Sequence, residues 1–249
     1  MEDRITRRMR KTWDALAQRN AMHFIATERD DWDLASFLES GKKTLRELWE
    51  LIGQVPVGDG VALDLGCGIG RLSFALAEIF ERVIGVDVSE AMIVRARQLQ
   101  QQLGCTNVDF FCNNGRDLSF VPTGSCCLGF SFIVFQHIPE PNVVLGYIKE
   151  LGRVTRQGGY VLFQVPVYRQ TLWVMPWRFV QALFRSSLWV AEPLGLVRPE
   201  RGLAFRGSRL PWGRLDRCLR ENALLPLVIH RAPSRYRLCN DLVIYCRRE

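Results

Sequence analysis

The chain has 249 residues and a formal net charge of +7, and this length allows one large domain or one domain with a substantial insert. Its hydrophobic fraction of 48% and charged fraction of 24% argue against a disordered or collagen-like protein. No uninterrupted apolar stretch is long enough to cross a bilayer, and the charged N-terminal segment lacks the apolar core of a secretory signal.

The charge distribution and the cysteine spacing predict which partners and which cellular compartment the protein has. Residues 1–150 carry 16 basic and 20 acidic residues, whereas residues 151–249 carry 17 basic residues, all arginine, and 6 acidic ones. The scattered arginines favour a compositional bias over a nucleic-acid or membrane surface. The eight cysteines form no CxxC pair, which predicts reduced thiols, a cytoplasmic location and no metal site.

Hydrophobic periodicity predicts an α/β protein with a doubly wound parallel sheet. Helical spacing covers residues 1–55, and from Val61 onward short apolar runs alternate with helical segments. The expected strands are residues 61–66, 81–89, 108–113, 126–135 and 160–167, followed by a hairpin of 224–231 and 237–248. The expected helices are residues 71–80, 90–104, 142–154 and 212–223, and a Trp-rich helical insert is expected at 168–205.

A glycine-rich turn follows the first expected strand, in the segment LDLGCGIGRL. Its glycines, Gly66, Gly68 and Gly70, do not have the spacing of a dinucleotide fingerprint, and the lysine of a Walker loop is absent. A plain tight turn would use the same glycines. However, Asp87 ends the second strand, where a carboxylate meets a ribose diol in sheets of this kind.

Five motifs follow one another along the chain: LDLGCGIGR, VIGVDVSEAMI, NNGRDL, FQHIP and RVTRQGG. As a set, over about residues 61–167, they resemble class I S-adenosylmethionine-dependent methyltransferases. The resemblance implies a Rossmann-like, seven-stranded sheet of order 3-2-1-4-5-7-6 with the seventh strand antiparallel. It also implies S-adenosylmethionine as the cofactor and S-adenosylhomocysteine as the product.

The resemblance assigns roles to residues at the ends of the strands. Asp87 would bind the ribose hydroxyls and Asp64 the ammonium group of the cofactor. The remaining cofactor contacts would be Gly66, Cys67, Gly68 and Gly70 under the methionine part, Val88 and Met92 beside the adenine, Asn114 with Gly115 or Arg116 at its edge, and Phe132 near the sulfonium.

His137, in FQHIP, is the candidate catalytic base, because an imidazole on the ligand side of the sheet can take a proton from an acceptor. The alternative is a histidine that only shapes its loop. Residues 1–55 could cap the pocket, with Trp13, Met22 and Phe24 as lining. The insert at 168–205 reads as a substrate lid, with peripheral membrane contact or a homodimer interface as alternatives.

These features predict a methyltransferase that acts on a small molecule. A nucleic-acid acceptor is less favoured, because an Asn-Pro-Pro-Tyr type of motif is absent after the fourth strand. A glycan or lipid-linked acceptor and a non-catalytic, cofactor-binding regulator remain as alternatives, since a fold alone does not establish activity.

Overall fold

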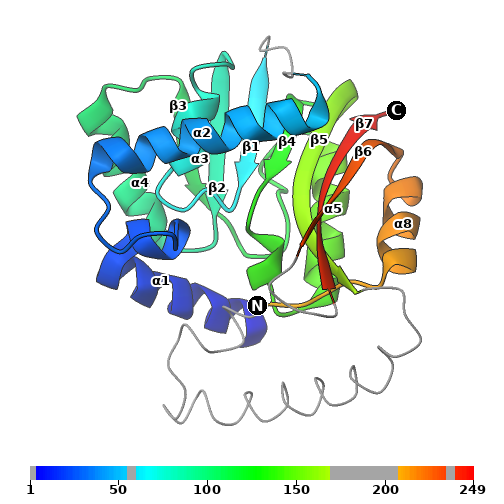
Figure 1. Ribbon diagram of the computed structural model, residues 1–249, viewed down its shortest axis with the longest axis horizontal. Coiled ribbons are helices and arrows are strands. Elements are labelled where there is room, and N and C mark those ends of the chain that lie inside the picture. The colour runs from blue at the N-terminus through cyan, green and yellow to red at the C-terminus, as the bar shows by residue number, and fades with distance from the viewer. Residues whose placement is uncertain (1–3, 55–59, 169–206, 234–238) are drawn as a thin grey trace.

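The computed structural model describes residues 4–54, 60–168, 207–233 and 239–249. A single seven-stranded sheet runs through the molecule in the order β3-β2-β1-β4-β5-β7-β6 (Figure 1). The strands are β1 (Val61–Leu65), β2 (Arg82–Asp87), β3 (Val108–Cys112), β4 (Cys126–Ser131), β5 (Thr155–Tyr168), β6 (Leu224–Pro233) and β7 (Cys239–Arg248). Neighbouring strands from β3 to β5 are parallel, and β7 is antiparallel to both β5 and β6. The expected sheet order and the antiparallel seventh strand are therefore confirmed.

Helices cover both faces of the sheet, because every central strand carries apolar side chains in both directions. On one face, α2 (Leu34–Ile52), α3 (Arg71–Leu76) and α4 (Glu90–Leu103) pack on side chains such as Ala62, Leu128 and Phe130. On the other face, α5 (Pro141–Val154) and α8 (Trp212–Glu221) pack on Leu63 and Phe163, among others. The core thus consists of two apolar layers with the sheet between them.

The N-terminal region contributes α1 (Arg4–Ile25) and α2. In Figure 1, α1 lies across one end of the sheet, and α2 crosses in front of the strands. α2 begins where Asp33 accepts a hydrogen bond from the Ser36 amide, and it ends at Gly53 in a left-handed conformation. The expected insert at residues 168–205 lies, apart from Tyr168, outside the described residues.

Three expected boundaries differ from the structure by more than two residues. Helix α3 stops at Leu76 instead of residue 80, and the chain then turns into β2. Strand β4 stops at Ser131, because Ile133 adopts a positive φ of 61° and residues Phe135–His137 form a 3₁₀ turn, η1. Strand β5 begins at Thr155, five residues earlier than the apolar pattern suggests, because Thr155 already pairs with Cys126 of β4.

Close packing of α2 on the start of α3 makes Gly41 a sensitive position. A Cβ atom there would overlap the backbone oxygen of Arg71, whereas at Gly146 in α5 the nearest atom would be 3.9 Å away. We expect Gly41→Ala to lower the free energy of unfolding by about 1–3 kcal/mol through overpacking. The matched Gly146→Ala should raise it by roughly 0.5–1 kcal/mol, as alanine normally does in a helix. Urea unfolding measures both, and a stabilised Gly41→Ala would contradict this packing.

Candidate functional site

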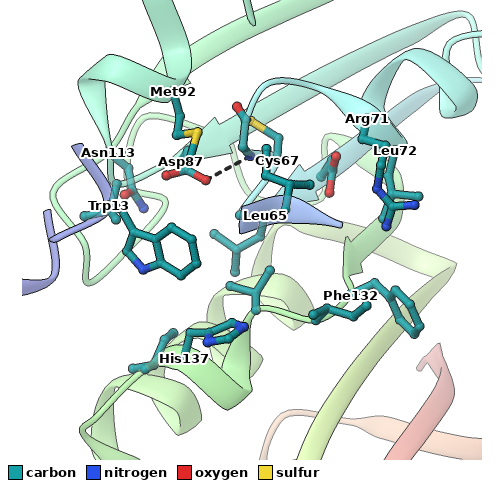
Figure 2. Close-up of a pocket in the computed structure, with 18 of the residues that line it drawn as sticks. Trp13, Leu65, Cys67, Arg71, Leu72, Asp87, Met92, Asn113, Phe132 and His137 are labelled. Atoms are coloured by element: carbon teal, nitrogen blue, oxygen red, sulfur yellow. Dashed lines mark hydrogen bonds between the residues drawn. The ribbon is translucent and has the colours of Figure 1, made fainter. Parts of the chain in front are cut away.

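A pocket opens at the carboxyl ends of the parallel strands, between the sheet and α1 (Figure 2). Asp87, Met92 and Asn113 lie at one end of it, and Arg71 and Phe132 lie at the other. The lining residues come from α1, the end of β1, the glycine-rich loop, the start of α3, the carboxyl ends of β2, β3 and β4 with the turns after them, and from α4 and α5: Met9, Trp13, Phe24, Ile25, Asp64, Leu65, Gly66, Cys67, Gly68, Arg71, Leu72, Asp87, Val88, Met92, Asn113, Phe132, Ile133, Val134, His137, Ile138 and Tyr147.

The glycine-rich loop is drawn tightly against its surroundings. The amides of Gly66 and Cys67 both donate to the Val86 carbonyl, at 2.6 and 3.0 Å. Gly66 has a φ of +79°, and a Cβ atom on it would overlap the side chain of Val134 after β4. Only glycine fits this position, because it combines a left-handed backbone with a close approach.

Asp87 braces the same loop from the end of β2. One carboxylate oxygen accepts from the Gly68 amide at 2.9 Å (Figure 2), and the other accepts from the Ser89 amide at 2.9 Å. Burial raises the pKa of Asp87, although the hydrogen bonds from Ser89 and Gly68 oppose that rise. A carboxylate held in this way is oriented before any ligand arrives.

Asp64 is a second carboxylate in the pocket and is buried, with only 2% of its surface exposed. It accepts a hydrogen bond of 2.6 Å from the Ser73 hydroxyl. Burial raises its pKa to about 6; the Ser73 hydrogen bond lowers it, and nearby Asp87 raises it. Two acidic groups therefore share one poorly solvated space, which favours a positively charged ligand group.

The raised pKa of Asp64 has a measurable consequence for stability. Between the unfolded value of 3.8 and the folded value of about 6, the folded state binds more protons than the unfolded state. The free energy of unfolding should therefore fall as pH rises through this interval, by roughly 3 kcal/mol in total. We expect Asp64→Asn to remove this loss, so that the variant matches the wild type near pH 4 and exceeds its stability at pH 7.5. Urea unfolding across this range tests the expectation, and an unchanged pH profile of the stability would contradict it.

The end of β3 differs from the prediction in one residue. Asn114, expected at the adenine edge, is exposed and bonds within its own turn to Arg116 and Asp117. The neighbouring Asn113 instead lines the pocket, and its amide nitrogen donates to the Tyr147 hydroxyl at 2.9 Å. In the sequence Asn113-Asn114-Gly115 either asparagine could have faced inward, and the structure places Asn113, not Asn114, in the pocket lining.

Three other predicted residues also lie outside the pocket lining. Gly70 precedes α3, where Phe74 and Phe110 pack closely against it. Gly115 faces Thr6 of α1, and Arg116 is exposed. The pocket does bring together the remaining predicted residues: Asp64, Gly66, Cys67, Gly68, Asp87, Val88, Met92, Phe132 and His137.

Helix α1 closes the pocket through polar contacts at its open side. The Arg10 guanidinium donates to the carbonyls of Val88 and Asn113, both at 3.0 Å. Asp14 accepts from the Ser89 hydroxyl at 2.6 Å and from the Ala91 amide at 3.1 Å. Sequence reasoning missed Arg10 and Asp14, because no local pattern relates them to residues more than 70 positions away.

His137 faces the pocket from η1 and lies near Trp13 of α1 (Figure 2). Its ring lies edge-on to Trp13, with ring centroids 5.3 Å apart. Its Nε2 atom is 3.1 Å from the side-chain amide nitrogen, Nε2, of Gln136. Next to it, Ile133 has a left-handed backbone that is unfavourable for a branched side chain, held by a hydrogen bond from its amide to Gln164. The turn after β4 therefore has a fixed conformation and forms part of the pocket wall.

Comparison with known proteins agrees with this geometry. Residues 62–159 match the family model described as "Methyltransferase domain". That match agrees with the sheet order and with the pocket at the carboxyl ends of β1, β2 and β4. Residues 62–159 of this chain form a methyltransferase domain of the class I S-adenosylmethionine-dependent type.

Three similar proteins show the range of this family. A ubiquinone biosynthesis O-methyltransferase of Thiobacillus denitrificans is 28% identical over 110 residues, which are 44% of this chain and 46% of that protein. A tRNA (guanine-N(7)-)-methyltransferase of Trichormus variabilis is 31% identical over 83 residues, 30% of this chain and 38% of the relative. The crystal structure of magnesium protoporphyrin IX methyltransferase from Synechocystis PCC 6803 with bound S-adenosylhomocysteine has a TM-score of 0.63 and 17% identity, and covers 96% of this chain and 98% of its own.

The chain spans less than half the length of these two curated relatives. Among the described residues, seven cysteines have free thiols, and no group of side chains is arranged to hold a metal ion. No helix in the described ranges is long and apolar enough to cross a membrane.

Proposed function

We propose that this protein binds S-adenosylmethionine and transfers its methyl group to a small-molecule acceptor. The observation that carries the proposal is the oriented, partly buried carboxylate of Asp87, bonded to the Gly68 amide of the glycine-rich loop at one end of the pocket. Such a carboxylate can accept hydrogen bonds from two ribose hydroxyls. Met92 and Val88 beside it offer apolar surface for an adenine ring.

The bound cofactor supplies a methyl group on a positively charged sulfur, which an acceptor displaces in line. The residues of this chain bind and orient the two reactants. Asp64 and Asp87 favour the positive charges of the cofactor, and Asn113 is placed to bond the adenine edge. Helix α1, which is held in place by the hydrogen bonds of Arg10 and Asp14, covers the pocket and excludes water from the bound reactants. His137 is in place to take the proton that an acceptor hydroxyl loses.

The apolar lining of the pocket supports an acceptor with an apolar body. Trp13, which His137 contacts, and Phe24, Phe132 and Ile133 line the same pocket. Apolar walls with few polar groups are typical of small-molecule sites. The ubiquinone biosynthesis and magnesium protoporphyrin IX methyltransferases are named for small-molecule acceptors of this kind. The similarity to a tRNA methyltransferase makes RNA the second candidate acceptor.

Calorimetric titration with S-adenosylmethionine, S-adenosylhomocysteine and NAD tests the cofactor assignment. We expect micromolar binding of the two sulfur compounds and none of NAD. Transfer of a labelled methyl group from S-adenosylmethionine to phenols, quinols, isoprenoids, porphyrins and tRNA then identifies the acceptor. Absence of binding by both sulfur compounds would overturn the proposal, and labelling of tRNA alone would replace the small-molecule acceptor.

A further inference from the structure

The turn after β4 holds a backbone conformation that its own sequence disfavours. Ile133 has a φ of 61°, in the left-handed region. A side chain branched at Cβ is rarely found there, because it crowds the backbone, and such a residue persists only where its surroundings hold it. Ile133 lines the pocket, so this unfavourable conformation lies at the ligand site itself. Residues held in this way recur at functional sites.

The side chain of Gln164, on β5, supplies the support. The regular ladder between β4 and β5 ends at the pair of Ser131 with Phe163, and Gln164 is the next residue of β5. Its side-chain oxygen accepts a hydrogen bond from the Ile133 amide at 3.2 Å. The Ile133 amide thus bonds to a side chain instead of a backbone carbonyl, and the chain leaves the sheet at this point.

The conformation of Ile133 decides what the residues after it contact. Val134 packs over the glycine-rich loop so closely that a Cβ atom on Gly66 would overlap its side chain. The Val134 carbonyl accepts from the His137 amide at 2.8 Å, which closes η1 and places His137 in the pocket wall. One turn therefore links the glycine-rich loop to the candidate base, and Gln164 holds that turn from the neighbouring strand.

We propose that Gln164 is a positioning residue for methyl transfer. The inference rests on the proposed function and deepens it. Gln164 is not among the described residues that line the pocket, so it acts through Ile133, which it keeps in the conformation that ligand binding requires. Without this hydrogen bond the turn would relax toward the conformations that isoleucine prefers, and a ligand would bind only the remaining fraction of molecules. The apparent affinity for the cofactor would then fall by the same factor.

Calorimetry with S-adenosylhomocysteine on the full chain tests this role. Gln164→Met keeps the size of the side chain but removes the acceptor. We expect the affinity to fall about 5- to 30-fold, the population factor that corresponds to the cost of a left-handed backbone. Gln164→Glu keeps an acceptor oxygen at the same place and should bind within about 2-fold of the wild type.

Ile133→Gly separates positioning from general support of the fold. Glycine adopts the left-handed conformation without steric cost, so the turn no longer needs the hydrogen bond from Gln164. In the Ile133→Gly background, Gln164→Met should change the affinity by less than about 2-fold, whereas a purely structural Gln164 would give the same change in both backgrounds. Gln98→Met, at an exposed position of α4, is the control for the change from glutamine to methionine.

Thermal unfolding shows whether each variant is folded. If Gln164→Met alone does not fold, the double variant with Ile133→Gly must restore folding, and a double variant that is also unfolded overturns the inference. A folded Gln164→Met protein that binds S-adenosylhomocysteine as the wild type does overturns it too, as does an equal loss in both backgrounds. These results leave the proposed function standing, because the wild type still binds. A wild type that binds no S-adenosylhomocysteine overturns the proposed function and, with it, the inference.

Discussion

Asp87→Ala is expected to weaken the binding of S-adenosylhomocysteine by about 10- to 150-fold, which corresponds to roughly 1.5–3 kcal/mol for hydrogen bonds to a charged group. The substitution removes the acceptor for two ribose hydroxyls. It also frees the Gly68 and Ser89 amides that the carboxylate now holds. Both effects act on the same end of the pocket, so the loss should appear as well for 5′-methylthioadenosine, which lacks the amino-acid part.

Calorimetry of the wild type, Asp87→Ala and Asp87→Asn measures this effect. The asparagine variant can still accept one of the two amide hydrogen bonds, so it keeps more of the loop geometry while losing the charge. Asp109→Ala is the matched control, because Asp109 is a carboxylate of the adjacent strand that pairs with Arg82 outside the pocket. Equal affinity in a folded Asp87→Ala protein would refute the ribose assignment.

A larger effect, on turnover, is expected for His137. If the imidazole takes the acceptor's proton, His137→Ala should lower kcat by about 10²- to 10⁴-fold with an acceptor found in the screen. The affinity for S-adenosylhomocysteine should change little, because His137 lies apart from the Asp87 end of the pocket (Figure 2). The backbone turn of η1 should persist, since it is made by the His137 amide and the Val134 carbonyl and not by the ring.

Single-turnover measurements of methyl transfer separate this chemical step from product release. His230→Ala provides the control, because His230 is exposed on the edge strand β6. A His137→Ala protein with wild-type kcat would show that alignment alone drives transfer. In that case His137 would serve to position Trp13, with which its ring is in edge contact.

Local patterns in the sequence are enough to predict most of the sheet and the strand ends that carry the site. Buried parallel strands read as short apolar runs, and the turns after them carry the glycines and Asp87, so both can be recognised without a partner in space. Boundaries were less accurate where tertiary contacts decide them. Thr155 joins β5 because it pairs with β4, and β4 ends where the Ile133 amide turns to Gln164.

The tertiary structure alone decides which polar groups enter the pocket. Two adjacent asparagines are equivalent in sequence, and only the packing of Asn113 on Tyr147 selects the inner one. Likewise, Arg10 and Asp14 bond to the segments after β2 and β3 because α1 folds over strands far along the chain, and Arg71 is buried because α2 crosses beside the loop. The sequence by itself determined the fold class through short-range periodicity, and its motifs, by their resemblance to a known family, predicted the strand order and the ligand-binding edge. The lining of the pocket depends on contacts between distant segments, which only the folded chain brings together.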